Sequence, residues 1–325
     1  MSNLEVEPRE LVCEPAPTGR SAVELLEPRD VPLGGPRAMT VRRTLPQRGR
    51  SLIGAWCFCD HYGPDDVSTT RGMVVPPHPH TSLQTVSWLF SGEIEHRDST
   101  GAHAFVRPGE LNLMTAGAGI QHSEVSTPAT TILHGVQLWT ALPESARHIA
   151  PKFERFIPDV FDHEGTSVRV FLGSLLGHES TASAFTPIVG AEFTVPANTS
   201  ITVPVDASFE HGVLVDVGSI TLDGTLIPLA NIGYVAPGAA RLELATGDEP
   251  ARIVLLGGEP FGESIVMWWN FIGRSHDEIV ASRTQWMADV IDGGDASGPF
   301  GHVDGYDGKP LPAPTLPLGR LRPRA

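Results

Sequence analysis

The chain has 325 residues, of which 41% are hydrophobic and 19% are charged, and this composition is typical of a soluble globular protein with room for two domains. Its formal net charge of −15 argues against direct binding of nucleic acid, because such binding requires lysine and arginine side chains that neutralise phosphates. No apolar stretch approaches the roughly 18 residues of a membrane span. We therefore expect neither membrane insertion nor, given an N-terminus without a signal-peptide pattern, export.

The first part of the chain divides into an arm and a β domain. Residues 1–35 are acidic and weakly periodic, and they predict an N-terminal arm. Residues 36–143 alternate short β-branched and aromatic segments with turn signals such as Gly63-Pro64 and Ser91-Gly92, which is typical of a sandwich or barrel. Residues 144–165 have no strong pattern and are expected to form a linker.

The second part repeats this architecture. Residues 166–291 predict another β domain, which contains only His211 in its strand region and ends in a helix. That helix has a capping box formed by Ser275 and Glu278, followed by apolar residues at helical spacing. The Gly- and Pro-rich residues 292–325 predict a C-terminal tail that wraps an existing domain. The fold class is therefore all-β with two domains.

The three cysteines indicate a reducing compartment. The cysteines are Cys13, Cys57 and Cys59, and the last two are too close together on an extended strand for an ordinary structural disulfide. We expect a cytoplasmic protein in which Cys57 and Cys59 are core residues, although a role in sensing oxidants is the alternative.

Two pairs of alternating polar residues carry the chemistry of the first domain. On a strand, residues two apart point to the same face, so His78 and His80 can be directed at one point, and so can His122 and Glu124. Imidazole and carboxylate ligands suit iron, manganese, nickel, copper or zinc, and four of them leave coordination sites for water or substrate. The alternative is a set of hydrogen-bonded core histidines with a surface glutamate.

Five further polar residues have structural interpretations beside functional ones. We expect His61, His96 and His134 to form structural hydrogen bonds rather than to bind metal. Gln84 and Gln137 are candidates for orienting ligands or substrate from behind the metal site. The equal alternative is that these glutamines only form hydrogen bonds with backbone groups.

The first domain resembles the pirin family of bicupins. The stretches that carry this resemblance are FCDHYGP (58–64), PPHPH (76–80), QTVSW (84–88), HRDSTG (96–101), PGELNLMTAGAGIQHSE (108–124) and GVQLW (135–139). The resemblance implies a bicupin whose N-terminal barrel holds iron through His78, His80, His122 and Glu124, and whose C-terminal barrel lacks metal. Fe(II) is accordingly the expected cofactor, with another divalent transition metal as the alternative.

This chain departs from the usual pirin pattern at two places. Thr81 to Gln84 replace the Arg-Gly-Phe-Glu that commonly follows the second histidine, and Ala118 replaces a common arginine in the Thr-Ala-Gly turn. Neither departure changes a proposed ligand. Both remove charge near the expected pocket, so the substrate preference of other pirins does not transfer.

The resemblance leaves two functions open. Some pirins are similar to quercetin 2,3-dioxygenases, which predicts an iron-dependent dioxygenase for a small aromatic or enolic substrate, with Glu124 both a ligand and the catalytic acceptor of the substrate hydroxyl proton. Other pirins act as nuclear cofactors of transcription factors. The alternative is therefore a non-catalytic, metal-dependent redox sensor or regulatory binding protein whose protein partner the sequence does not identify.

Overall fold

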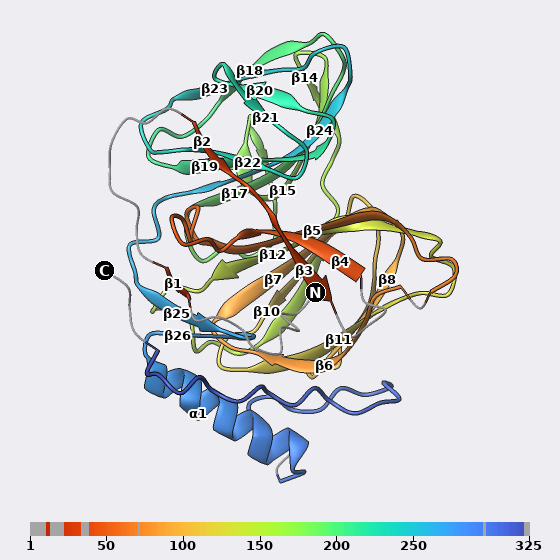
Figure 1. The fold of residues 1–325 in the computed structure, drawn as a ribbon, viewed down its shortest axis with the longest axis vertical. Coiled ribbons are helices and arrows are strands. Elements are labelled where there is room, and N and C mark those ends of the chain that lie inside the picture. Colours follow the sequence, from red (N-terminus) through yellow and green to blue (C-terminus); the bar gives the residue numbers. More distant parts are fainter. Residues whose placement is uncertain (1–10, 14–22, 34–38, 71, 295–296, 322–325) are drawn as a thin grey trace.

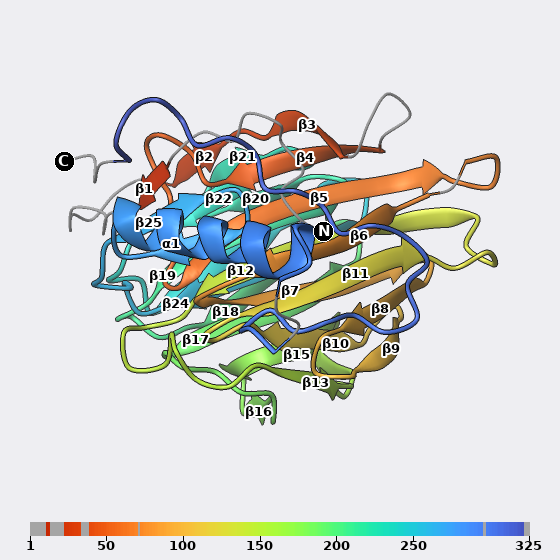
Figure 2. The ribbon, with the colours of Figure 1, turned by 90° about the horizontal axis from the view of Figure 1, so that it is seen from below.

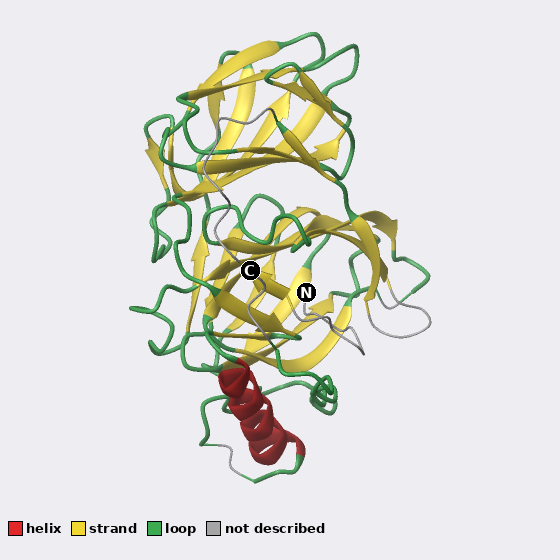
Figure 3. Ribbon diagram, turned by 60° about the vertical axis from the view of Figure 1, so that its left-hand side comes forward, coloured by secondary structure: helices red, strands yellow, loops and turns green. Residues whose placement is uncertain are grey.

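The computed structural model describes residues 11–13, 23–33, 39–70, 72–294 and 297–321. Within them, strands form two groups that lie one above the other, and the helix α1 (His276–Trp286) lies beneath the lower group (Figure 1). Figure 3 shows the same division by secondary structure, with strands in yellow and the helix in red. The prediction of an all-β chain with a short C-terminal helix is confirmed.

The lower group is a barrel made of two facing sheets, which we call the first barrel. Its larger sheet has the spatial order β13 (Lys152–Phe156), β10 (Leu111–Thr115), β7 (Leu83–Ser91), β12 (Ile132–Ala141), β5 (Trp56–Asp66), β4 (Met39–Leu45), β3 (Arg29–Leu33). Its smaller sheet has the order β6 (Val74–His80), β11 (Ile120–Ser126), β8 (Ile94–Asp98), β9 (His103–Val106). All the strand pairs within these sheets are antiparallel.

The upper group is the second barrel. Its larger sheet has the order β14 (Phe161–His163), β15 (Thr166–Leu175), β17 (Ile188–Val195), β24 (Ala251–Gly258), β19 (Glu210–Val217), β22 (Ile232–Val235), β2 (Glu24–Leu26), and β16 (His178–Glu179) pairs with β15. Its smaller sheet has the order β18 (Ser200–Pro204), β23 (Arg241–Ala245), β20 (Ile220–Leu222), β21 (Thr225–Ile227). Valine, isoleucine, leucine and phenylalanine side chains from both sheets form one buried cluster, so this barrel has an apolar interior.

Successive side chains along each strand point to opposite faces of the larger sheet of the first barrel, and the two faces have different surroundings. On β7, Val86 and Trp88 belong to a cluster that also contains Phe171 and Leu256 of the second barrel. The residue between them, Ser87, lies on the opposite face, inside the first barrel, where its hydroxyl contacts Glu124. One face thus joins the barrels, and the other forms the wall of the interior.

The two barrels approach each other closely. Gly54 has a φ of +54°, and a Cβ at this position would lie 2.7 Å from the Cα of Gly258 in the second barrel. Polar contacts reinforce the approach: the indole N–H of Trp88 donates to Glu192 at 2.7 Å. A side chain at position 54 would therefore force the barrels apart.

A small third sheet and the helix pack against the first barrel. The sheet contains β1 (Leu11–Cys13), β25 (Ile265–Trp268) and β26 (Phe271–Gly273), and a bridge joins Phe271 to Thr81 just after β6. In the view from below, α1 crosses the face of the molecule near β6 (Figure 2). The capping prediction is confirmed, since the Ser275 hydroxyl accepts from the Glu278 amide, and α1 continues into one π-helical turn, η1 (Met287–Ile291).

The tail extends along the edge of β6. The amide of Leu311 donates to the carbonyl of Pro77 at 2.8 Å, and the indole N–H of Trp286 donates to the carbonyl of Leu311 at 2.9 Å. Gln121 of β11 also donates to the Gly301 carbonyl at 2.6 Å. The tail residues 297–321 thus contact the strands of the smaller sheet, as expected of a wrapping segment.

The domain boundaries predicted from the sequence stay predictions. Strands within the expected arm belong to three different sheets. β1 pairs with β25 in the small third sheet, β2 pairs with β22 in the second barrel, and β3 pairs with β4 in the first barrel. Part of the expected linker also pairs, since β13 lies beside β10.

Among the described residues, no helix is long and apolar enough to cross a membrane.

Candidate metal centre

The two predicted ligand pairs lie on neighbouring strands of the smaller sheet. His78 and His80 alternate on β6, and His122 and Glu124 alternate on β11, which pairs with β6 in antiparallel register with His122 opposite His78. A bulge between His122 and Glu124 shifts the register, so that Glu124 lies opposite Val75. Both pairs therefore face the interior of the first barrel.

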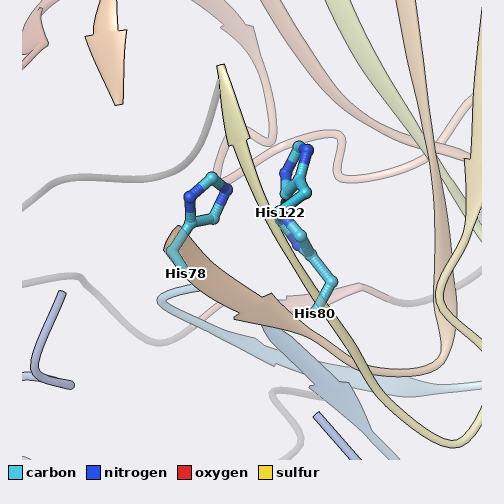
Figure 4. Close-up of side chains that lie close together, drawn as sticks. All are labelled: His78, His80 and His122. Carbon is cyan, nitrogen blue, oxygen red and sulfur yellow. Dashed lines mark hydrogen bonds between the residues drawn. The ribbon is translucent and has the colours of Figure 1, made fainter. Parts of the chain in front are cut away.

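Three histidines converge inside the barrel. The ligand nitrogens of His78, His80 and His122 all lie within 4.8 Å of one another, and Nε2 of His80 is 3.0 Å from Nε2 of His122 (Figure 4). The ring centroids of His78 and His122 are 4.3 Å apart, and none of the three side chains is more than 1% exposed. This arrangement presents several imidazole nitrogens to one point that is closed to bulk water.

Glu124 lies beside this group rather than within it. Its carboxylate joins His122 and His96 in a second group whose ligand atoms lie within 4.8 Å of one another. The Ser87 hydroxyl, on the opposite wall, is 3.4 Å from Oε1 of Glu124. The structure thus brings the three histidines together and places the carboxylate next to His122.

The protonation of the histidines suits metal binding. Nδ1 of His78 donates to the Pro76 carbonyl at 2.8 Å, which leaves Nε2 with a lone pair, and that buried atom has no hydrogen-bond partner among the described residues. Burial lowers the pKa of His78 to about 4. Burial, together with the neighbouring imidazoles, also lowers the pKa of His80 and of His122. Neutral imidazoles around Nε2 of His78, which has a lone pair and no hydrogen-bond partner among the described residues, fit a divalent transition metal.

Behind His122 lies a second histidine with its own carboxylate. Nδ1 of His96 is 3.3 Å from Nδ1 of His122, and Nε2 of His96 is 3.1 Å from Oδ2 of Asp98. Burial would raise the pKa of Asp98, but hydrogen bonds from His96 and Thr100 outweigh it and lower the pKa below its usual value. Sequence reasoning treated His96 as a structural residue and did not single out Asp98, although the alternation of the two on β8 carried the signal.

The wall opposite the ligands is polar and aromatic. Gln137 accepts a hydrogen bond from Ser87 at 2.9 Å, and its Nε2 is buried without a partner among the described residues. Trp139 stacks on Phe58, with ring centroids 4.0 Å apart, and meets His80 edge-on at 5.2 Å. Gln137 and Trp139 therefore lie on the same face of β12, directed toward the ligand sheet.

Gln84 has a structural environment. Its amide N–H groups donate to Thr115 and to the Ser183 carbonyl, and its Oε1 accepts from Thr140 at 3.2 Å. None of these partners is a proposed ligand. The two departures from the pirin pattern also lie apart from the ligands' contacts: Thr81 donates to the Ile272 carbonyl, and Ala118 is exposed.

A further cluster joins the barrels away from this site. His61 and His134 of the first barrel and Asp216 of the second place their ligand atoms within 4.8 Å of one another. Arg252 contacts the other oxygen of Asp216 at 2.5 Å, and a nitrogen of Arg42 is 3.4 Å from Nε2 of His61. Two guanidinium groups make this cluster unfavourable for a cation. Sequence reasoning missed Asp216, although an aspartate within the apolar run of β19 was a signal.

Comparison with known proteins identifies the family. The pirin family model matches residues 38–140, and the model of the pirin C-terminal cupin domain matches residues 190–290. A protein of Pseudomonas aeruginosa that is provisionally named a quercetin 2,3-dioxygenase is 40% identical over 291 residues, which cover 89% of each chain. The chain belongs to the pirin family. The bicupin prediction is thereby confirmed.

Solved structures place this pirin among its relatives. The crystal structure of a quercetin 2,3-dioxygenase from Acinetobacter baumannii superposes with a TM-score of 0.85 at 34% identity, covering 92% of this chain and 98% of that one. A nickel(II) complex of the bacterial pirin YhhW from Escherichia coli has a TM-score of 0.57 at 18% identity, covering 74% of this chain and 99% of that one. The second likeness concerns the fold alone.

Proposed function

We propose that this pirin is an iron-dependent dioxygenase of the quercetin 2,3-dioxygenase type. The observation that carries the proposal is the convergence of His78, His80 and His122, buried inside the first barrel with the Glu124 carboxylate beside them. The similarity to proteins named quercetin 2,3-dioxygenases supports this reaction class. The polar and aromatic wall opposite the ligands supports a planar, oxygen-rich substrate.

We propose His78, His80, His122 and Glu124 as the ligands of Fe(II). Another divalent transition metal is the alternative. The nickel(II) complex of a bacterial pirin is the reason for retaining this alternative. When bound, such an ion supplies Lewis-acid polarisation and one-electron chemistry. Three neutral imidazoles and one carboxylate would leave the centre with a net charge near +1, which an enolate substrate neutralises.

Three residues inside the first barrel have proposed roles in binding a small aromatic or enolic substrate. Glu124 takes the proton of the substrate hydroxyl, and its Oε1 lies 3.4 Å from the Ser87 hydroxyl, whose proton is donated to Gln137. The unpartnered Nε2 of Gln137 donates to a substrate carbonyl oxygen, since a buried amide N–H without an acceptor is costly. Trp139 offers an aromatic edge and its buried indole N–H beside His80.

Oxygen consumption tests the proposal. Iron-loaded protein should consume oxygen with quercetin or another flavonol, and His80→Ala should abolish this turnover. His302→Ala is the matched control, because the side chain of His302 is 73% exposed and lies outside the first barrel. Equal rates for the wild-type protein and the His80→Ala variant, or no turnover across a flavonol panel, would exclude the dioxygenase.

The same experiment separates the regulatory alternative. A protein that binds stoichiometric iron and turns over no flavonol fits a metal-dependent redox sensor or regulatory binding protein. We also propose a cytoplasmic location, because neither of the buried cysteines Cys57 and Cys59 forms a disulfide, as expected in a reducing compartment.

A further inference from the structure

We propose that His96 and Asp98 set the tautomer of His122 and so present its Nε2 lone pair to the metal; this inference rests on the proposed metal centre. The three side chains form a continuous chain of contacts on the inner face of β8 and β11, where Asp98 lies opposite His122 in the register. The links are Nδ1 to Nδ1 at 3.3 Å between the histidines and Nε2 to Oδ2 at 3.1 Å at Asp98. None of the three is more than 3% exposed, so water does not compete for these hydrogen bonds.

The direction of the chain follows from the acceptor at its end. Oδ1 of Asp98 accepts from the backbone amide of Thr100 at 2.8 Å, from its hydroxyl at 2.6 Å and from the amide of Ala102 at 3.3 Å. Oδ2 is therefore the oxygen that faces His96, and an ionised carboxylate can only accept. Nε2 of His96 accordingly carries a proton, and this N–H donates a hydrogen bond to Oδ2 of Asp98.

The proton on His96 determines the proton on His122. In a neutral imidazole one nitrogen donates and the other accepts, so Nδ1 of His96 is the acceptor in its contact with His122. Nδ1 of His122 must then carry the proton and donate it. The remaining nitrogen of His122, Nε2, keeps its lone pair, and this is the atom that lies 3.0 Å from Nε2 of His80 in the centre.

Two ligands are thus prepared in different ways. His78 obtains the same tautomer from a local contact, because its Nδ1 donates to the Pro76 carbonyl two residues earlier. His122 obtains it through a second imidazole that ends on a charged carboxylate. A carboxylate that accepts a hydrogen bond from a ligand histidine, here through His96, fixes the ring and makes the ligand nitrogen a better donor to the metal.

Asp98→Asn tests the relay with little change of shape. Thr100 and Ala102 donate to the first oxygen of residue 98, so the asparagine places its carbonyl there and its amide N–H₂ against Nε2 of His96. His96 must then accept at Nε2 and carry its proton on Nδ1, which forces the proton of His122 onto Nε2. We expect the dissociation constant for Co(II) or Ni(II), measured by competition with a chelator at fixed pH, to rise about 10- to 100-fold.

Glu95→Gln is the matched control. Glu95 also lies on β8, but its carboxylate contacts Arg97 and His103 at 2.7 Å and its side chain is 30% exposed. This amide substitution should change the dissociation constant by no more than about twofold. A purely structural role of Asp98 would lower the melting temperature of the metal-free Asp98→Asn variant without changing its metal affinity.

A second readout needs no metal. The imidazole ¹⁵N chemical shifts of metal-free protein should show the Nδ1–H tautomer of His122 in the wild-type chain and the Nε2–H tautomer in Asp98→Asn. Equal metal affinity of Asp98→Asn and Glu95→Gln, or an unchanged tautomer, would overturn the relay while leaving the metal centre intact. Failure of the wild-type protein to bind metal would instead remove the proposed centre together with the relay.

Discussion

Oδ1 of Asp216, in the second barrel, lies 2.6 Å from Nε2 of His61, in the first. The same oxygen is 2.6 Å from Nε2 of His134, and Arg252 pairs with the other oxygen. Burial would raise the pKa of Asp216, but the hydrogen bonds from the two histidines hold it well below its usual range. One carboxylate therefore connects strands of both barrels, at a distance from the proposed metal ligands.

Removal of this charge should destabilise the whole chain. Asp216→Asn leaves Arg252 without its carboxylate and His61 without a charged acceptor in a site from which water is excluded, so we expect a loss of about 3 kcal/mol in the free energy of unfolding. Chemical denaturation measures the loss. Asp248→Asn, at an exposed position, is the control and should change stability by less than about 0.5 kcal/mol. Equal stability of the two variants would contradict this role of Asp216.

The buried histidine of the second barrel, His211, should make the stability of the fold sensitive to acid. His211 is 1% exposed in the second barrel, neither ring nitrogen has a partner among the described residues, and burial lowers its pKa from 6.5 to about 4. The unfolded chain therefore binds the proton more readily, so the contribution of His211 is complete above pH 6.5 and is lost as the pH falls toward 4.

His211→Gln should remove this part of the pH dependence. At about 1.4 kcal/mol per pKa unit, the wild-type chain should lose about 3 kcal/mol more than the variant between pH 7.5 and pH 4. Urea unfolding of both metal-free proteins across this range measures the difference. Parallel stability curves for the two would show that His211 does not titrate in this way.

The sequence was sufficient for those features that depend on local periodicity. Alternation along a strand placed His78 with His80 on one face, and the capping box at Ser275 located the start of α1. Cys57 and Cys59 were correctly interpreted as core residues. In each case the physical cause lies within a few neighbouring residues.

The remaining features depend on contacts between distant segments. The pairing of β2 with β22 and of β1 with β25 follows from which strand edges are left open, and hydrophobic periodicity carries no information on that choice. Asp60 accepts two hydrogen bonds from Arg43, and Asp216 contacts His61 and Arg252, and all these partners lie on other strands. Only the fold supplies their partners.

The tail offers a test of how the ligand strand is held. Phe300 is 1% exposed in a cluster with Trp286 and Phe271, so Phe300→Ala should loosen the tail from the edge of β6. Hydrogen–deuterium exchange at the Leu311 amide, which is bonded to Pro77, should become at least about tenfold faster, as a local loss of 1.4 kcal/mol requires. Leu318→Ala removes a fully exposed side chain and should leave this exchange unchanged. Slow exchange in both variants would contradict the prediction.

Gln137 should affect substrate rather than metal. Gln137→Leu removes the unpartnered amide donor of the inner wall, and we expect kcat/KM for quercetin to fall about 10- to 100-fold with metal content unchanged. The exposed Gln285→Leu serves as the control. A variant that retains full activity would exclude Gln137 from substrate binding, and one that loses its metal would assign it to the centre instead.

Metal analysis of the purified protein, combined with electron paramagnetic resonance of its Co(II)-loaded form before and after addition of quercetin, tests whether the buried histidines hold a metal beside which a flavonol binds. The proposed centre predicts one iron or other divalent transition metal per chain, lost in His122→Ala, and a Co(II) spectrum that changes when the flavonol binds beside Glu124. A metal content that is the same in His122→Ala, or a spectrum that quercetin leaves unchanged, would contradict it.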